Sequence, residues 1–192
     1  RLVTDPLGLK DTGFSIADTA RLATAYADDC PRPRRTREPD VVPFLPGLPG
    51  IHMDPSRAFD ATAFPSGGAG MVGSAKDTMD LLEALRRGGQ ALMPAERAAE
   101  MARDQIGELD IEGSPGWGYG LGFSVLRDAR AAGLAESPGT WRWGGAYGHS
   151  WFVDPAKRLT LVAFTNTALE GMSNGGRFST DLSRAIYAGL ET

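Results

Sequence analysis

The sequence contains few of the residues that build disulfides, zinc sites and basic surfaces. Of its 192 residues, one is cysteine (Cys30), two are histidine (His52 and His149) and three are lysine. One cysteine excludes an internal disulfide and a cysteine metal cluster, and two histidines are too few for a multi-histidine zinc site. A net charge of -4 with both signs mixed argues against nucleic acid as a partner. The cysteine and histidine counts therefore predict no metal site. No apolar run reaches the roughly 20 residues of a membrane span, so we expect no membrane span.

The chain starts at Arg1, without a methionine or a signal-peptide pattern. We therefore expect a processed or truncated chain, whose N-terminal signal, if there is one, lies outside this sequence. The compartment, cytoplasmic or secreted, stays open on the sequence alone. The length is enough for one domain with its own core.

Residues 1–116 are predicted to be helical and rich in loops. The end of a helix and a turn are expected within residues 1–14, and the alanines of residues 15–28 permit a short helix. Eight of the 13 prolines lie in residues 31–65, where no periodicity survives. Because loops of that length are usually functional covers or disordered, this range is predicted to be irregular.

Two helices downstream of the proline-rich range are predicted to pack against a core. Ser74 is a good N-cap with Asp77 three residues later, and an apolar stripe follows until Gly88. Pro94 fits the first turn of the second helix. Neither helix needs a functional interpretation.

Residues 117–192 are predicted to form three antiparallel strands and a C-terminal helix. Apolar side chains alternate with glycines over residues 118–126, which indicates a neighbour close to the glycine face, ordinarily a helix. Alternation over residues 147–154 predicts a second strand, and residues 159–166, apolar on both faces, predict a third that is buried on both. Helical spacing over residues 178–190 completes an α+β fold.

The stretch with most chemical potential is residues 141–155, WRWGGAYGHSWFVDP. It holds three tryptophans, three glycines and His149. Two consecutive glycines let a bound group approach the backbone closely. Trp143 and Trp151 are either core aromatics or walls of a substrate site, and His149 is either a strand-surface histidine or a site residue. We predict that the functional site lies here.

A Ser–His–Asp triad is an alternative within the same stretch. Ser66 or Ser150, together with His149 and Asp154, would provide a nucleophile, a base and an orienting carboxylate. However, Ser66 does not lie in a G-x-S-x-G motif, and strand alternation places His149 and Ser150 on opposite faces. His52, in the proline-rich range, is expected to be solvated.

Four blocks of the sequence resemble, in order, the serine β-lactamase-like hydrolases. They are LGLKDTGF (residues 7–14), FPSGGAGMVGSAKD (64–77), GWGYGLGF (116–123) and WGGAYGHSWFVDP (143–155). More narrowly, they are similar to the carboxylesterases related to class C β-lactamases and D-Ala-D-Ala peptidases. The resemblance runs from Arg1 nearly to the end. It implies a β-lactamase/transpeptidase-like fold, with an antiparallel sheet flanked by helices.

The resemblance also implies roles for residues of the last block. The family uses a Ser-x-x-Lys nucleophile, a Tyr-x-Asn-like base motif and a Lys-Thr-Gly-like triplet on a strand beside the cleft. Trp143-Gly144-Gly145 stands where the triplet is expected, and the backbone N–H of Ala146 is implied as one of two oxyanion donors. Tryptophan in place of lysine removes an anchor for a substrate carboxylate, which favours neutral esters over penicillin-like acids. The further candidates for shaping the acyl or alcohol pocket are Tyr147, His149 and Trp151.

The other two family motifs are absent from the sequence. No serine stands three residues before Lys10, Lys76 or Lys157, and none of the four tyrosines is followed two residues later by asparagine. In the family both motifs lie upstream of the segment with which this chain begins. We therefore expect the C-terminal part of one longer β-lactamase-like domain, incomplete as a fold, with the nucleophile and base on a missing or separate N-terminal part. An exposed sheet edge and apolar surface would favour a complex with that fragment or a swapped oligomer.

The leading prediction is a carboxylesterase that acts on a small-molecule ester or amide through an acyl-serine intermediate, without a cofactor. Two other functions stay open. The missing nucleophile suits a catalytically inactive binding module of the same fold. β-Lactamase or D-Ala-D-Ala peptidase activity is the other alternative.

Overall fold

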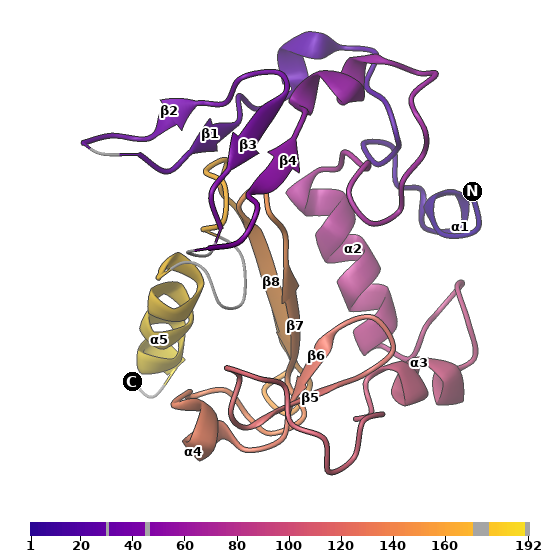
Figure 1. Ribbon diagram of the computed structural model, residues 1–192. Helices are drawn as coiled ribbons and strands as arrows, with labels where there is room; N and C mark the ends of the chain where they lie inside the picture. The colour runs from indigo at the N-terminus through magenta and orange to yellow at the C-terminus, as the bar shows by residue number, and fades with distance from the viewer. Residues whose placement is uncertain (30, 45–46, 171–176, 191–192) are drawn as a thin grey trace.

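Five antiparallel strands, paired in sequence order, form the central sheet of the computed structural model (Figure 1). The structure describes residues 1–29, 31–44, 47–170 and 177–190, so Cys30 lies outside the described residues. The strands are β5 (Trp117–Tyr119), β6 (Ser124–Leu126), β7 (Trp141–Gly144), β8 (His149–Asp154) and β9 (Leu159–Phe164). Pairing is most extensive between β8 and β9, and in the neighbouring pair Trp143 of β7 lies opposite Trp151 of β8.

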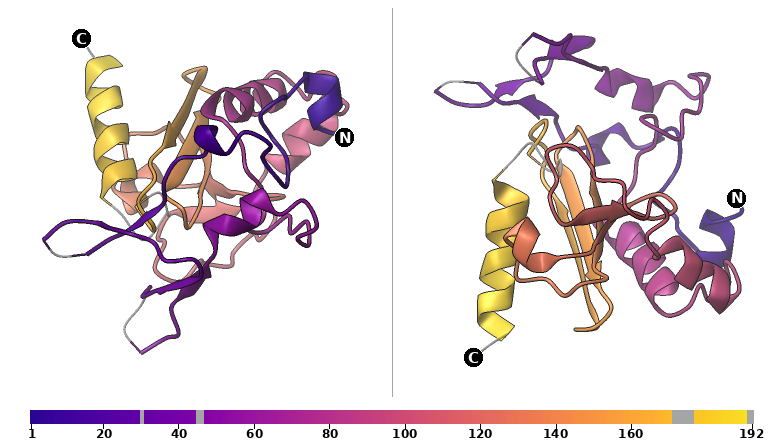
Figure 2. Two further views of the ribbon diagram at one scale, coloured as in Figure 1. Left: turned by 90° about the horizontal axis from the view of Figure 1, so that it is seen from above. Right: turned by 60° about the horizontal axis from the view of Figure 1, so that its bottom comes forward.

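The sheet lies between helices that cover its two faces (Figure 2). On one face α2 (Ala75–Arg86) packs against a buried apolar cluster, and α3 (Ala95–Met101) adjoins it. On the other face lies α5 (Phe178–Leu190), as its helical spacing predicted. The cluster beneath α2 consists of Leu82, Phe123, Val125, Trp141 and Val153. Among the described residues, no helix is long and apolar enough to cross a membrane.

Helix α2 begins where its capping residue predicted. The Ser74 side chain accepts a hydrogen bond from the backbone N–H of Asp77 at 3.1 Å. The Asp77 carboxylate does not reach back to complete a capping box. Instead it accepts from the backbone N–H of Asp11 and the hydroxyl of Thr12, both at 2.8 Å. A buried carboxylate thus joins the N-terminal segment to the start of α2.

Buried polar groups join α5 to the sheet, beside a ring contact between Tyr187 and Phe152. Buried Asp154 of β8 accepts from the Tyr187 hydroxyl at 2.5 Å and from the backbone N–H groups of Ser137 and Lys157. Burial tends to raise the pKa of Asp154, but these hydrogen bonds outweigh it, and the net pKa is lowered. Burial and the bond to Asp154 together raise the pKa of Tyr187. The pair is therefore an ionised carboxylate and a neutral phenol at neutral pH.

A second buried carboxylate, Glu136, holds the next turn of α5. It accepts from the Ser183 hydroxyl at 2.7 Å and pairs with Arg142 of β7. The Arg142 guanidinium lies 4.7 Å from the ring centroid of Trp117, and burial lowers its pKa. Charged groups that are buried in this way are retained only when they are paired.

The N-terminal part differs from the predicted loops and helices. Residues 15–28 form no α-helix; they contain a short 3-10 turn at Thr19–Arg21 and then β1 (Tyr26–Ala27). The proline-rich range contains strands β2 (Arg34–Arg35), β3 (Asp40–Val42) and β4 (Ile51–Met53), followed by a 3-10 helix. Residues 45 and 46 of that range lie outside the described part. These strands have two or three residues each, too few to show a periodicity in the sequence.

The expected three strands of residues 117–192 are five in the structure. Residues 118–126 fold back as the hairpin β5–β6, and the second predicted strand is preceded by β7. The glycine face of β5 is indeed closely covered, because a Cβ on Gly118 would overlap Asp104 and Arg127. At Gly118 the neighbours are the segment after α3 and an arginine, whereas at Gly120 the neighbour is the carbonyl of Met101, the last residue of helix α3. The alternation pattern alone thus predicts one strand where a glycine-rich turn divides the segment into two.

Strand β9 is less buried than its two apolar faces predicted. None of its six residues is fully buried, and Phe164 is 41% exposed. The cause is its position, since β9 is the last strand of the sheet and pairs only with β8 among the described strands. The described part of the chain therefore leaves the apolar side chains of β9 partly exposed.

The hydroxyl of Tyr187 is expected to be important for stability. Tyr187→Phe leaves one bond to buried Asp154 unmade, so the free energy of unfolding should fall by about 1–3 kcal/mol in a urea titration. Tyr119→Phe is the matched control, because the Tyr119 hydroxyl donates to no residue in the described ranges, and its effect should stay within about 0.5 kcal/mol. Equal losses in the two variants would contradict this account of α5 docking.

Candidate functional site

The predicted site residues meet at the turn that joins β7 to β8. Backbone hydrogen bonds close this turn from within: the N–H of Gly145 donates to the carbonyl of His149, and the N–H of Gly148 donates to the carbonyl of Gly145, both at 2.9 Å. Gly148 has a φ of +102°, and a Cβ there would overlap the backbone of Thr167. Only glycine fits at that position.

Neighbouring segments hold the same turn from outside. The carbonyl of Ala146 accepts from the N–H of Leu169 at 2.9 Å, and the carbonyl of Gly148 accepts from Thr165. The Tyr147 hydroxyl accepts from the backbone N–H of Asp54 at 3.0 Å. The turn is therefore fixed by the segment after β9 and by the segment after β4.

Two donors of the turn are left over. Within the described ranges, the backbone N–H groups of Ala146 and Tyr147 donate to no acceptor, although the carbonyl of Ala146 and the N–H and carbonyl groups of Gly145 and Gly148 are bonded. Ala146 is only half-buried, so its N–H is not enclosed by the core. A rigidly held N–H without a partner is the arrangement that stabilises negative charge developing on a substrate oxygen.

Trp143 lies three residues before Ala146, at an open part of β7. The pairing of β6 with β7 stops at Arg142, one residue earlier. Trp143 is 40% exposed, and the Tyr119 ring meets it edge-on, with centroids 5.4 Å apart. An exposed aromatic surface therefore lies two residues from Gly145.

His149 lies on the inner side of the turn. A Cβ built on Gly145 would overlap the His149 imidazole, so the ring rests directly on the Gly145 backbone. The His149 ring also contacts the Phe164 ring, with the two ring centroids 5.4 Å apart. Burial lowers the pKa of His149, which keeps the imidazole neutral at neutral pH.

Two residues predicted to shape a substrate pocket have packing roles in the structure. Trp151 contacts Phe123 and Trp141 edge-on and adjoins the cluster beneath α2. Tyr147 packs with Val42 and its neighbours on the β3–β4 hairpin. Trp151 therefore packs in the sheet core, and Tyr147 packs where the β3–β4 hairpin covers the turn.

The structure separates the members of the alternative triad. His149 and Asp154 lie on opposite faces of β8, and Asp154 is bound to Tyr187 beneath α5. Ser66 belongs to a turn closed by the N–H of Gly70, next to the start of α2. The triad prediction is therefore wrong, because Asp154 does not orient His149, and no carboxylate of the described ranges forms a hydrogen bond with it.

Sequence reasoning missed the residues that clamp the turn. Leu169, Thr165 and Asp54 act on it through backbone groups or a short hydroxyl. No local pattern reveals such contacts, since Asp54 and Tyr147 are 93 positions apart. The only sequence signal for these contacts was the length of the proline-rich range, because loops of that length are usually functional covers or disordered.

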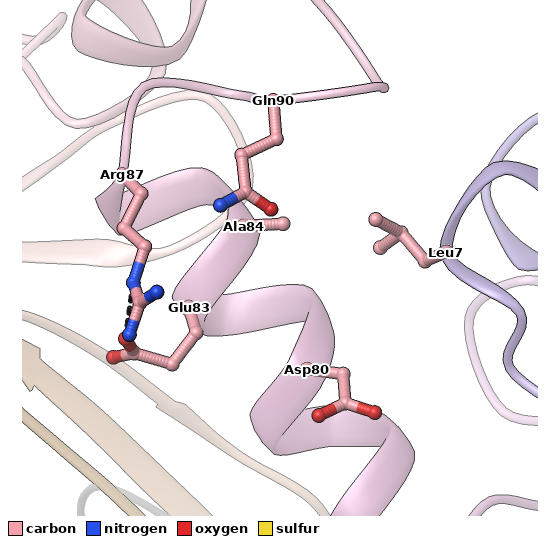
Figure 3. Close-up of a pocket in the computed structure, with 6 residues that line it drawn as sticks. All are labelled: Leu7, Asp80, Glu83, Ala84, Arg87 and Gln90. Carbon is pink, nitrogen blue, oxygen red and sulfur yellow. Dashed lines mark hydrogen bonds and ion pairs between the residues drawn. The ribbon is translucent and has the colours of Figure 1, made fainter.

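The surface hollows lie away from this turn. One, of about 320 Å³, opens between α1 (Thr4–Leu7) and α2 (Figure 3). Glu83 in its wall is bound by Arg86 and Arg87, chiefly Arg86, and its pKa is lowered to about 2. A second hollow lies beside His52 and Arg37. Neither contains a residue of the turn, and we assign no chemistry to them.

Stability should depend on the protonation of His149. Because its pKa is lowered by burial, the unfolded chain binds a proton more readily than the folded chain below the ordinary value of 6.5. The free energy of unfolding should therefore fall as the pH drops from about 7.5 to about 5.5, and His149→Phe should remove most of that fall. Urea titrations at both pH values measure it, with His52→Gln as the control. An unchanged slope in His149→Phe would contradict this assignment.

Comparisons with known proteins identify the family and the fold. A protein-family model described as Beta-lactamase matches residues 1–184. Esterase EstB of Burkholderia gladioli is 45% identical over 188 residues, covering 97% of this chain and 47% of the esterase. The solved structure of EstCE1, described as a hydrolase with promiscuous acyltransferase activity, superposes with a TM-score of 0.90 at 44% identity, covering 97% of this chain and 49% of that one. Simvastatin synthase LovD of Aspergillus terreus, at 17% identity and a TM-score of 0.69 over 99% of this chain and 48% of its own, shares the fold.

This chain spans about half the length of the relatives it matches. The β-lactamase/transpeptidase-like fold and the antiparallel sheet flanked by helices are confirmed. With a family match over nearly all of its residues, the chain belongs to the beta-lactamase family.

Proposed function

We propose that this chain is the C-terminal portion of a serine hydrolase, a carboxylesterase that works through an acyl-serine intermediate. Residues 1–116 and 117–192 would together be the C-terminal part of one β-lactamase-like domain. The names of EstB and EstCE1 describe an esterase and a hydrolase, which supports this class of reaction. In this proposal the β7–β8 turn stabilises the oxyanion, and Trp143, Gly144 and Gly145 border the acyl group.

The observation that carries the proposal is the unpartnered N–H of Ala146. When a serine oxygen attacks an ester carbonyl, the carbonyl oxygen becomes negatively charged before the alcohol leaves with a proton from the general base. A donor that is already fixed in place stabilises this charge without reorganisation. Bonds to the Ala146 carbonyl and to the backbone groups of Gly145 and Gly148 fix this donor.

The surroundings of the donor favour neutral esters. Trp143 is an exposed aromatic where a lysine would bind a substrate carboxylate. The neighbouring cation of β7, Arg142, is buried against Glu136 and so cannot replace it. We therefore expect an uncharged acyl or alcohol group against Trp143, which makes penicillin-like acids and D-Ala-D-Ala peptides the less favoured substrates.

The nucleophile and base would come from a complementary N-terminal part. The sequence has neither Ser-x-x-Lys nor Tyr-x-Asn. The edge of β9 that pairs with no described strand, together with its half-exposed apolar side chains, is suited to accept further strands. A swapped oligomer would meet the same need, since it also covers the edge.

A binding module without catalysis is the second candidate. The absent Ser-x-x-Lys favours it, because the turn could bind an acyl oxygen without any covalent step. The two functions differ in whether the N–H of Ala146 affects a rate or only an affinity.

Removing that N–H tests the proposal directly. Ala146→lactic acid, introduced as an ester in the backbone, deletes the donor and keeps the methyl group. In the hydrolase that joins this chain to its Ser-x-x-Lys part, kcat for a neutral p-nitrophenyl ester should fall by about 100- to 1000-fold. The ester carbonyl at Gly145 also becomes a weaker acceptor for Gly148.

Gly148→glycolic acid is the matched control for that side effect. It removes the Gly148 donor from the same carbonyl and leaves the Ala146 N–H in place. We expect kcat to change by less than about tenfold in the control. Equal losses in both variants, or no loss at Ala146, would contradict the proposed role.

A further inference from the structure

The imidazole of His149 occupies the space that a side chain at position 145 would need. The three heavy atoms nearest to a Cβ built on Gly145 are His149 Nε2, Cε1 and Cδ2, the last at 2.8 Å. The backbone N–H of Gly145 also donates to the carbonyl of His149. Ring and backbone of one residue thus contact the residue that precedes the Ala146 donor.

The ring has no polar partner that would explain its place. Within the described ranges, neither ring nitrogen of His149 makes a hydrogen bond or an ion pair. The elements packed against it are the turn and β9. The turn contributes one titratable group, Tyr147, whose hydroxyl is bound to Asp54, and β9 (Leu159–Phe164) contains none. Arg142 and Asp154 face α5 on the opposite side of the sheet.

We propose that His149 is a positioning residue, whose ring fills the space between Gly145 and Phe164 and thereby holds the turn that presents the Ala146 N–H. The ring acts by shape: it is wide enough to support the Gly145 backbone on one side and to meet the Phe164 ring on the other. The catalytic part of this inference rests on the proposed function of Ala146; the structural part does not.

The inference predicts a difference between loss of the ring and loss of its nitrogens. His149→Ala leaves a void beside Gly145, so the turn can shift, and displacements of about 1 Å cost about 100-fold in rate. We expect kcat of the joined hydrolase to fall by about 10- to 100-fold, with KM changed by less than about threefold. His149→Phe keeps a flat ring without the nitrogens and should retain kcat within about threefold.

Hydrogen exchange in this chain gives a readout that needs no activity. The amides of Gly145 and Gly148 close the turn, and their exchange should become at least about tenfold faster in His149→Ala but not in His149→Phe. His52→Ala, on β4, is the control and should leave both amides unchanged.

A double substitution tests the contact itself. Gly145→Ala should destabilise the fold, because its methyl group overlaps the His149 ring. Adding His149→Ala removes the overlap, so the double variant should melt at a higher temperature than Gly145→Ala alone. A double variant that is less stable than Gly145→Ala would overturn the contact.

The outcomes separate this inference from the role of Ala146. Unchanged exchange at Gly145 and Gly148 in His149→Ala would overturn the positioning role, whatever the rate does. The same low kcat in His149→Phe and His149→Ala would also overturn it, because the nitrogens and not the ring shape would then matter. Faster exchange in His149→Ala, restored by phenylalanine but without any loss of kcat, would support the contact and refute the oxyanion role of the turn.

Discussion

The structure depends on the closed hydrogen bonding of the β7–β8 turn. Within the described ranges, Gly145, Ala146 and Gly148 use five backbone groups to bond to each other, to His149 or to segments far away in the sequence. A turn held in this way has little freedom to follow a ligand, so the N–H of Ala146, which makes no such bond, stays where it is. In the proposed function this rigidity, rather than a reactive side chain of this chain, stabilises the oxyanion.

The two faces of the sheet serve this turn by different means. Beneath α2, stacked aromatic and aliphatic side chains fix β7 and β8 through burial of apolar surface. Beneath α5, the buried carboxylates Glu136 and Asp154 join the helix to β7 and β8 through Ser183 and Tyr187. The alternation of β8 assigns Trp151 to the first face and Phe152 to the second. The contacts beneath α2 and those beneath α5 therefore both hold β7 and β8, the two strands that the turn connects.

The sequence predicted the elements whose signals are local. The cap at Ser74, the helix over residues 178–190 and the alternation of β8 all follow from patterns within a few residues, and the fold class followed from family-like motifs. The short strands β1 to β4 could not be predicted, because pairing partners rather than composition define them. The same limit applies to the candidate site: Trp143 to Ala146 were predicted from a motif, whereas the contacts of Asp54 and Leu169 with the turn require the fold. For Trp151 the sequence left packing and binding open because both favour aromatic side chains, and the structure shows its packing in the sheet core.

The central claim is that this chain contributes an oxyanion strand to a nucleophile located elsewhere. Its most direct test is intact mass spectrometry of the purified protein, with any polypeptide that accompanies it, after reaction with a fluorophosphonate ester. The account predicts that the phosphonyl group appears on the polypeptide, or the portion of a longer chain, that contains Ser-x-x-Lys. A phosphonyl group on residues 1–192, at Ser66 or Ser150, would contradict it.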